Sequence, residues 1–421
     1  MSILIKNVLL YNIITDILIE GNKIKTIAPN INVVADKVID GTEKAAVPGF
    51  VNCHTHAGMT VFRGFGDDME LESWLSDKIW PYEAKLTSEI VYHATKLACL
   101  EMIKTGTTCF NDMYWNLSAG REATEEMGIR SFQGKVILDS DHTKTFNETV
   151  REVESSFNKY QNTELTTFTL APHAVYTVST RILEWLRDFS KANDLLVHMH
   201  LAETPLECDN CKKQYGVTPV RYLNRIGLLS PRLIIAHCLW LDDEEMQMLA
   251  DNDVKIVHNP NSNLKLASGY HFKYHEMKDK GLTVGLGTDG VSSSNNLDMT
   301  ETMKVASFIG KAWRDDPTAC SAADMFKCAT HNGGIILNKQ LGEIKEGYLA
   351  DIVLFDLHAP AFTPNYNLIS NIVYSGNGND VDTVICNGKV LMENRKVENE
   401  DEILRNGNIY AHKLVDNAAA E

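Results

Sequence analysis

Two histidines separated by one residue, His54 and His56, follow an apolar run in the stretch AVPGFVNCHTHAGMT. Side chains at positions i and i+2 of a strand project from the same face. The pair can therefore hold one metal ion from a single strand end. A single His-x-His is a weak signal by itself, because histidines near strand ends often bond to the backbone of a loop.

Ligand-capable side chains recur at the ends of other apolar runs. The run LLVHMHLAET ends with His200 and Glu203, LIIAHC with His237, and TVGLGTDG with Asp289. A further run, TLAPHA, ends with His173. If these runs are strands of one closed sheet, their ends converge, and residues that are distant in sequence surround one point.

We expect His54, His56, His200 and Asp289 to bind one divalent metal ion. Three imidazoles and one carboxylate suit Zn²⁺, and Fe²⁺ or Mn²⁺ also fits these donors. A water molecule at the open coordination position would become far more acidic. The donor set therefore predicts a hydrolytic site.

Two other histidines are ambiguous. His198 shares the expected strand face of His200, but we favour His200 as the ligand because Glu203 follows it closely. His258, in KIVHNP, is interpreted as structural. The pair Cys208 and Cys211 in CDNC has metal-like spacing, but no His-x-Glu precedes it, so we interpret both as ordinary helical thiols.

Short apolar runs alternate with longer amphipathic stretches through the middle of the chain. SEIVYHATKLACLEMIKTG and TRILEWLRDFSKAND have the apolar spacing of helices. The runs span residues 46–51, 107–111, 135–138, 167–171, 195–199, 232–236, 254–257 and 283–287. Strands alternating with helices predict a parallel α/β sheet, and eight units predict a (β/α)₈ TIM-type barrel. The alternative is a doubly wound open sheet, but no Gly-x-Gly-x-x-Gly supports it.

Both ends of the chain read as short strands. ILIKNVLL and DILIEGNKIKTIA lie near the start, and ADIVLFDL and VDTVICNGKVLMENRKV lie near the end. Asn387-Gly388 is a strong hairpin signal. We therefore expect residues 1–48 and 342–421 to form a composite β-sandwich domain around a catalytic barrel of residues 49–341.

Composition excludes several classes of partner. The formal net charge of −16 disfavours nucleic acids and anionic membranes, since both bind basic surfaces. The nine scattered cysteines indicate reduced thiols and a cytoplasmic protein. The N-terminus lacks the layout of a signal peptide, and no apolar run approaches the ~20 residues needed to span a bilayer.

The segments PGFVNCHTH, HMHLAET, AHC, NPNSNLKLASG and GLGTDG together resemble the motifs of the amidohydrolase superfamily. Within it, the chain is most similar to the 5-methylthioadenosine/S-adenosylhomocysteine deaminases, from its first residue to about residue 390. The resemblance implies one metal ion on His54, His56, His200 and Asp289. Binuclear members carry a bridging modified lysine at the end of strand four, where this chain reads LAPHA.

The resemblance also implies roles for the remaining candidates. Glu203 and His237 would transfer protons, Glu83 and His173 would contact the substrate, and Trp74 would form a pocket wall. Glu83 is the candidate for binding ribose hydroxyls. The expected substrate is an adenine nucleoside, and the expected assembly is a homo-oligomer, either a dimer or a tetramer.

The implied reaction is hydrolytic deamination at C6 of the adenine ring. Glu203 would protonate ring N1, Asp289 or His237 would take a proton from the attacking water, and ammonia would leave an inosine-type product. The long aromatic stretch after the first run, residues 61–83, is expected either to cover the pocket or to pack as a surface helix.

One departure affects the choice of substrate. Relatives that accept S-adenosylhomocysteine use arginines after strand three to bind its carboxylate. The corresponding residues 131–150 contain no arginine and offer only Lys135 and Lys144. Lysine lacks the bidentate fork of arginine, so methylthioadenosine or adenosine is expected to serve at least as well.

Three other functions fit the same residues. One is a deaminase or chlorohydrolase that acts on guanine, 8-oxoguanine, cytosine or a triazine. The second is a cyclic-amide hydrolase. The third is a non-catalytic binding barrel, which the complete set of candidate ligands and proton carriers disfavours.

Overall fold

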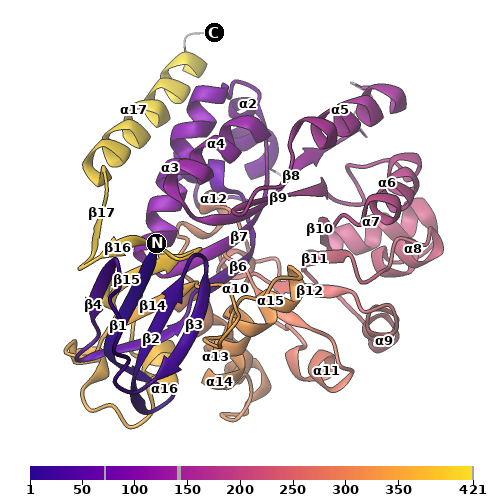
Figure 1. Ribbon diagram of the computed structural model, residues 1–421. Coiled ribbons are helices and arrows are strands. Elements are labelled where there is room, and N and C mark those ends of the chain that lie inside the picture. The colour runs from indigo at the N-terminus through magenta and orange to yellow at the C-terminus, as the bar shows by residue number, and fades with distance from the viewer. Residues whose placement is uncertain (71–72, 140–143, 420–421) are drawn as a thin grey trace.

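The computed structural model describes residues 1–70, 73–139 and 144–419, which form an eight-stranded barrel beside a nine-stranded sheet (Figure 1). The barrel strands are all parallel and neighbour one another in chain order. They are β6 (Phe50–Thr55), β7 (Thr107–Tyr114), β8 (Arg130–Ile137), β9 (Thr166–Pro172), β10 (Val197–Leu201), β11 (Leu233–His237), β12 (Lys255–His258) and β13 (Val284–Leu286).

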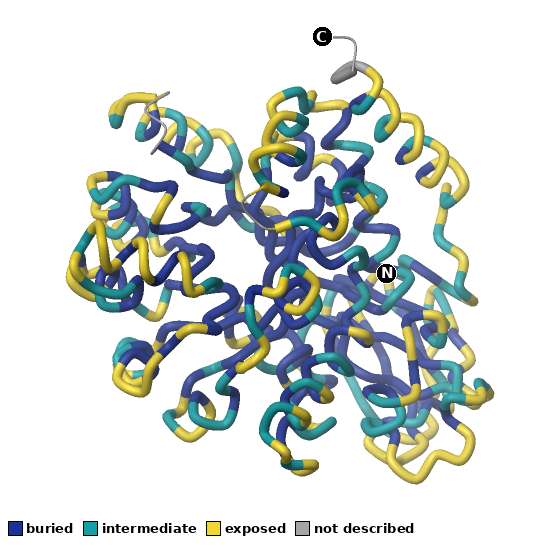
Figure 2. The backbone as a smooth tube through the Cα atoms, turned by 180° about the vertical axis from the view of Figure 1, so that it is seen from behind, coloured by how far each residue is buried: buried dark blue, intermediate teal, exposed yellow. Residues whose placement is uncertain are grey.

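The amide of Asp289 donates to the carbonyl of His54 at 3.0 Å, which joins the end of the last strand to the first. The predicted (β/α)₈ barrel is therefore confirmed, and the open doubly wound sheet is excluded. Strands covered on both faces are apolar almost throughout, which explains why these runs stand out in the sequence. Figure 2 shows buried backbone concentrated at the centre and exposed residues on the outer helices.

Helices connect the barrel strands and surround them. Several begin at side-chain caps: Thr204 before α7 accepts the amide of Glu207, and Ser179 before α6 accepts that of Ile182. The helices are α3 (Ser88–Lys104), α4 (Leu117–Met127), α5 (Phe146–Lys159), α6 (Thr180–Asn193), α7 (Pro205–Tyr215), α8 (Pro219–Arg225), α9 (Asp243–Asp251), α10 (Pro260–Lys265), α11 (Tyr274–Asp279), α12 (Val291–Ser294), α13 (Met299–Arg314), α14 (Ala322–Ala329) and α15 (His331–Ile336).

The second sheet combines strands from both ends of the chain, as predicted. It contains β1 (Ser2–Leu10), β2 (Ile13–Glu20), β3 (Lys23–Ala28), β4 (Lys37–Asp40), β5 (Lys44–Pro48), β14 (Ile352–Asp356), β15 (Val381–Cys386), β16 (Lys389–Glu393) and β17 (Lys396–Val397). Side chains of the N-terminal and C-terminal strands share one apolar core that includes Ile5, Ile17 and Leu354. Asn387 and Gly388 both have positive φ and turn β15 into β16, as the hairpin signal predicts.

The apolar run of residues 46–51 is not one strand, contrary to its interpretation from the sequence. Ala46–Pro48 belong to β5 and pair with β14, whereas β6 begins at Phe50. Gly49 separates them, and a Cβ at this position would lie 2.1 Å from Oγ1 of Thr108. Only glycine permits this close approach, so the chain passes directly from one sheet into the other here.

Two contacts join the barrel to segments from the C-terminal part of the chain. Buried Arg130 at the start of β8 pairs with Asp351 at 3.1 Å and also donates to Oδ1 of Asn387 at 3.0 Å. Helix α17 (Glu400–Ala419) lies beside α3, where the Tyr410 hydroxyl bonds to Glu89 (Figure 1).

The domain limits given above remain a prediction. Among the described residues, no helix combines the length and apolarity that crossing a membrane requires.

Candidate metal and catalytic site

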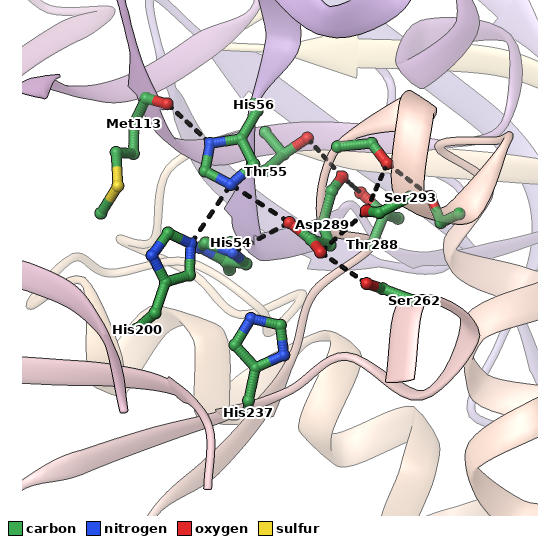
Figure 3. Close-up of polar contacts among 12 residues, drawn as sticks. His54, Thr55, His56, Met113, His200, His237, Ser262, Thr288, Asp289 and Ser293 are labelled. Carbon is green, nitrogen blue, oxygen red and sulfur yellow. Dashed lines mark hydrogen bonds and ion pairs between the residues drawn. The ribbon is translucent and has the colours of Figure 1, made fainter. Parts of the chain in front are cut away.

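The four expected ligands meet at the C-terminal ends of the barrel strands (Figure 3). Oδ1 of Asp289 lies 3.2 Å from Nε2 of His54 and 3.2 Å from Nε2 of His56. Nε2 of His200 lies 3.2 Å from Nε2 of His56. Ligand atoms at 2.0–2.1 Å from a tetrahedral Zn²⁺ are about 3.3 Å apart, so these spacings suit one metal ion. We call these four residues the metal cluster.

The facing nitrogens of His56 and His200 support a cation between them. Nδ1 of His56 donates to the Met113 carbonyl at 2.7 Å, and Nδ1 of His200 donates to the His173 carbonyl at 2.8 Å. When both rings are neutral, as metal ligation requires, each Nε2 carries a lone pair, and two lone pairs 3.2 Å apart repel each other unless a cation or a proton lies between them. A metal ion removes this repulsion, so the residues present fit the group.

The electrostatics of the cluster agree with this interpretation. Burial lowers the pKa of His54 to about 4 and that of His200 well below its usual range. Burial also acts to lower the pKa of His56, but the adjacent Asp289 carboxylate raises it to about 9. Burial opposes ionisation of Asp289, yet His54 and His56 hold its pKa well below its usual range. The cluster thus holds an ionised carboxylate that favours positive charge beside it.

Further contacts fix Asp289 and His54 in place. Oδ2 of Asp289 accepts hydrogen bonds from Ser262 at 2.6 Å and Ser293 at 2.8 Å, which leaves Oδ1 directed at the histidines. Nδ1 of His54 lies 2.7 Å from Nε2 of His198. His198 therefore lies behind an expected ligand, where its ring can orient the His54 ring.

Glu203 and His237 lie together beside the metal cluster. Nε2 of His237 is 3.8 Å from Oε2 of Glu203. With His54, His200 and Asp289, His237 also forms a group whose potential ligand atoms all lie within 4.8 Å of one another. Nδ1 of His237 donates to Oδ1 of Asn263 at 2.8 Å, and Ser268 donates to Oε1 of Glu203 at 3.1 Å. His237 and Asp289 have φ values of 75° and 60°, a strained conformation typical of functional sites.

Glu207 holds the turn that carries Glu203. This buried carboxylate accepts the backbone amides of Ala202 at 2.9 Å and Glu203 at 2.8 Å. Burial raises the pKa of Glu207 to about 7, although the hydrogen bonds from the two backbone amides act to lower it. The residue was not singled out in the sequence, where it reads as an ordinary acidic residue in the first turn of a helix.

The metal cluster opens into a pocket that His56, His200 and Asp289 line together with apolar and aromatic side chains. The expected substrate-binding residues Trp74, Glu83, His173 and Glu203 line this pocket, and so does the expected proton carrier His237. The helical segments η2 (Trp74–Ile79) and α2 (Trp80–Glu83) supply one wall of this pocket. Residues 71 and 72 of that stretch lie outside the described chain.

Glu83 presents one free oxygen. Its Oε2 accepts a hydrogen bond from Nε1 of Trp115 at 3.1 Å, whereas its buried Oε1 has no hydrogen-bond partner among the described residues. Burial raises the pKa of Glu83, while Trp115 and Tyr114 act to lower it. His173 bonds through Nδ1 to Oγ1 of Thr177 at 2.9 Å, and burial lowers its pKa to about 3, so a neutral ring faces the pocket.

Other candidates lie away from the pocket. Lys135 and Lys144 both pair with Glu152 on α5, at 2.7 and 2.8 Å. No lysine or arginine of the described chain lines the pocket, and residues 140–143 of the same stretch lie outside the description. His258 stacks on Phe272 at 3.9 Å in a separate small cavity.

The comparisons with known proteins agree with this geometry. The model of the Amidohydrolase family matches residues 45–391. The chain belongs to the amidohydrolase family. This amidohydrolase is 44% identical over 405 residues to the 5'-deoxyadenosine deaminase of Methanospirillum hungatei, with 95% of this chain and 90% of that protein covered. It is 45% identical to the 5-methylthioadenosine/S-adenosylhomocysteine deaminase of Thermococcus onnurineus, with 94% and 95% covered.

A solved structure resembles the amidohydrolase over nearly its whole length. An adenosine deaminase from Xanthomonas campestris with bound zinc superposes with a TM-score of 0.93 at 30% identity, covering 98% of each chain. Together with the buried cluster of histidines and an aspartate, family membership supports a site for a divalent metal ion in this enzyme.

Proposed function

We propose that this amidohydrolase hydrolytically deaminates adenine nucleosides at C6 and releases ammonia and the inosine-type product. The observation that carries the proposal is the convergence, in one pocket, of a metal cluster, a carboxyl group at Glu203 and a second carboxyl group at Glu83 with a free oxygen. The relatives named as deaminases of 5'-deoxyadenosine and of methylthioadenosine support the same substrate class.

We assign the metal as Zn²⁺, held by His54, His56, His200 and Asp289, because three imidazoles and a carboxylate are typical zinc donors. Fe²⁺ and Mn²⁺ fit the same donors. When bound, the ion acts as a Lewis acid and makes a water molecule acidic near neutral pH. Neutral rings at His54 and His200 suit this role, since burial keeps the pKa of both below the usual range.

The proton transfers fall to Glu203 and His237, which lie beside the metal cluster, and to Asp289 within it. Glu203 donates a proton to ring N1, which makes C6 electrophilic enough for attack by water. Asp289 or His237 takes a proton from the attacking water, and His237 stabilises the negative charge that develops on its oxygen. The residue that took the water proton passes it to the amino group, which leaves as ammonia when its bond to C6 breaks. Glu203 takes back the remaining hydroxyl proton as the C6 carbonyl forms.

The rest of the pocket suits the nucleoside. We expect the free Oε1 of Glu83 to accept a ribose hydroxyl, His173 to contact the base or sugar, and Trp74 to cover an apolar face. Val136 and Leu138 also line the pocket. A neutral, apolar 5' substituent therefore fits better than the charged amino-acid end of S-adenosylhomocysteine.

An ammonia-release assay on metal-replete protein tests the proposal. Adenosine, 5'-deoxyadenosine, methylthioadenosine and S-adenosylhomocysteine are compared with guanine, 8-oxoguanine, cytosine, a chloro-triazine and a cyclic amide. Preferred turnover of the adenine nucleosides supports the proposal. Release of ammonia from another ring alone, or ring opening without ammonia, would assign one of the alternative functions.

Assembly and location are further parts of the proposal. All nine cysteines are buried and free, which suits a reducing cytoplasm. We also expect a homo-oligomer, either a dimer or a tetramer, and light scattering with size-exclusion chromatography measures this directly.

A further inference from the structure

The segment 259–269, which reads NPNSNLKLASG, contributes no residue to the proposed chemistry, yet it touches three residues that do. It follows β12, contains α10 and reaches the pocket through Leu266. Each of its three site contacts is a side-chain hydrogen bond to a different proton-handling residue. They join Ser262 to Oδ2 of Asp289 at 2.6 Å, Asn263 to Nδ1 of His237 at 2.8 Å, and Ser268 to Oε1 of Glu203 at 3.1 Å.

We propose that residues 259–269, which we call the positioning segment, set the orientation of Asp289, His237 and Glu203 together and select the protonated atom of His237 and Glu203. The inference rests on the proposed function for the roles of these three residues. Leu266 is the one residue of the segment that lines the described pocket, and its side chain has no group that handles protons. Ser262, Asn263 and Ser268 are therefore positioning residues, and all three are buried.

Ser268 determines which oxygen of Glu203 carries the proton. Its hydroxyl donates to Oε1, so Oε1 must be the acceptor and the acidic proton belongs on Oε2. Oε2 is the oxygen that lies 3.8 Å from Nε2 of His237 at the floor of the pocket. Without Ser268 the carboxyl group is free to rotate and to place its proton on either oxygen.

Asn263 determines the tautomer of His237. Oδ1 of Asn263 accepts the Nδ1 proton, so Nε2 of the neutral ring carries the lone pair that faces Glu203 and the metal cluster. His237 has a φ of 75°, so its backbone is strained and this bond helps to fix the ring. An apolar residue at position 263 would let the proton move to Nε2 and remove the acceptor.

Ser262 acts on the metal cluster. It binds Oδ2 of Asp289 and leaves Oδ1 at 3.2 Å from both His54 and His56. Ser293 holds the same Oδ2, so the loss of Ser262 removes one of two bonds. The segment is itself anchored, because the Ser268 carbonyl accepts Nε1 of Trp240 at 2.9 Å.

The test uses the full-length protein with three substitutions and one matched control. Ser262→Ala, Asn263→Leu and Ser268→Ala each remove one site contact. Asn261→Ala changes the same segment at a side chain that bonds outward to Glu301. Ser268→Thr and Asn263→Asp retain the hydroxyl or the acceptor oxygen. For each protein we measure Zn²⁺ affinity by chelator competition, kcat and KM for adenosine, and the melting temperature.

We expect S268A and N263L to keep wild-type Zn²⁺ affinity and KM while kcat falls ~10–100-fold, the range found for residues that orient ligands. The variants S268T and N263D should recover most of kcat. Ser262→Ala should lower Zn²⁺ affinity ~10-fold, and N261A should match the wild type in every measurement. Loss of one contact therefore changes either the Zn²⁺ affinity or kcat, whereas general destabilisation of the fold would change both.

Wild-type kcat in S268A and N263L, or equal losses in N261A, would overturn the inference. Failure of S268T and N263D to exceed S268A and N263L in kcat would also overturn it. If the wild-type protein deaminates no adenine nucleoside, the proposed function is wrong, and unchanged Zn²⁺ affinity in S262A then decides against the positioning segment independently.

Discussion

Nε2 of His198 lies 2.7 Å from Nδ1 of His54, inside the barrel and behind the metal cluster. Both rings are fully buried. The contact directs Nε2 of His54 toward Asp289, 3.2 Å away. A residue that lies two positions before a proposed ligand on β10 is thus in contact with a second proposed ligand on β6.

We predict that His198→Ala weakens metal binding without preventing folding. Loss of the partner frees the His54 ring to rotate, and such changes lower metal affinity ~10–100-fold. Chelator competition measures the affinity. His258→Ala is the matched control, since it also removes a buried histidine but one that stacks on Phe272. Equal Zn²⁺ affinities in the two variants would contradict the assignment.

We predict that Glu203→Gln retains the metal and loses most turnover. The amide preserves shape but supplies no acidic proton, and general acid–base catalysis contributes ~10²–10⁴-fold. Elemental analysis checks the metal content, and the ammonia assay checks kcat. A kcat near that of the wild type would remove Glu203 from the mechanism.

We predict that methylthioadenosine and 5'-deoxyadenosine have higher kcat/KM than S-adenosylhomocysteine. Lys135 and Lys144 are both paired with Glu152, and the described pocket lining has no cation for the homocysteine carboxylate. The comparison is made with one preparation at one salt concentration, because exposed charges are screened by salt. An equal or higher value for S-adenosylhomocysteine would show that the enzyme binds the carboxylate by other means.

We predict that the wild type loses stability relative to the Glu207→Gln variant as pH rises from 4.5 to 7. Burial raises the pKa of Glu207 from 4.5 to about 7, so the folded state binds more protons than the unfolded state across this range. The free energy of unfolding therefore falls as pH increases, by up to about 3 kcal/mol for this group.

Denaturant unfolding of both proteins at several pH values measures this effect. The difference between them isolates Glu207, because Asp112, whose pKa burial raises to about 6, is present in both. A difference that stays constant with pH would mean that Glu207 is ionised in the folded protein throughout the range.

The ends of the barrel strands could be predicted because one local pattern locates them. An apolar run followed by His54 and His56, or by Asp289, indicates a buried strand and the polar residues at its C-terminal end. Because the C-terminal ends of all strands converge in a closed barrel, these residues lie close together. The limit of β6 was missed, because Ala46–Pro48 and Phe50–Val51 are equally apolar although they belong to different sheets.

The supporting residues could not be predicted from local patterns. Ser262, Asn263 and Ser268 are ordinary loop residues until the fold places them beside partners that are distant in sequence. Strand alternation places His198 and His200 on one face, but only depth within the barrel distinguishes a ligand from its support. The hydrogen bond from His56 to the Met113 carbonyl could not be predicted, because every residue has a backbone carbonyl.

Strand β5 pairs with β1 near the start of the chain and with β14 at residues 352–356, and after Gly49 it continues directly into the strand that bears His54 and His56. During synthesis, the edge of β5 that pairs with β14 has no partner until residues 352–356 are made, when more than three-quarters of the 421 residues have been translated. The β5–β14 pairing that precedes the histidine-bearing strand β6 therefore becomes possible only after all eight barrel strands have been translated.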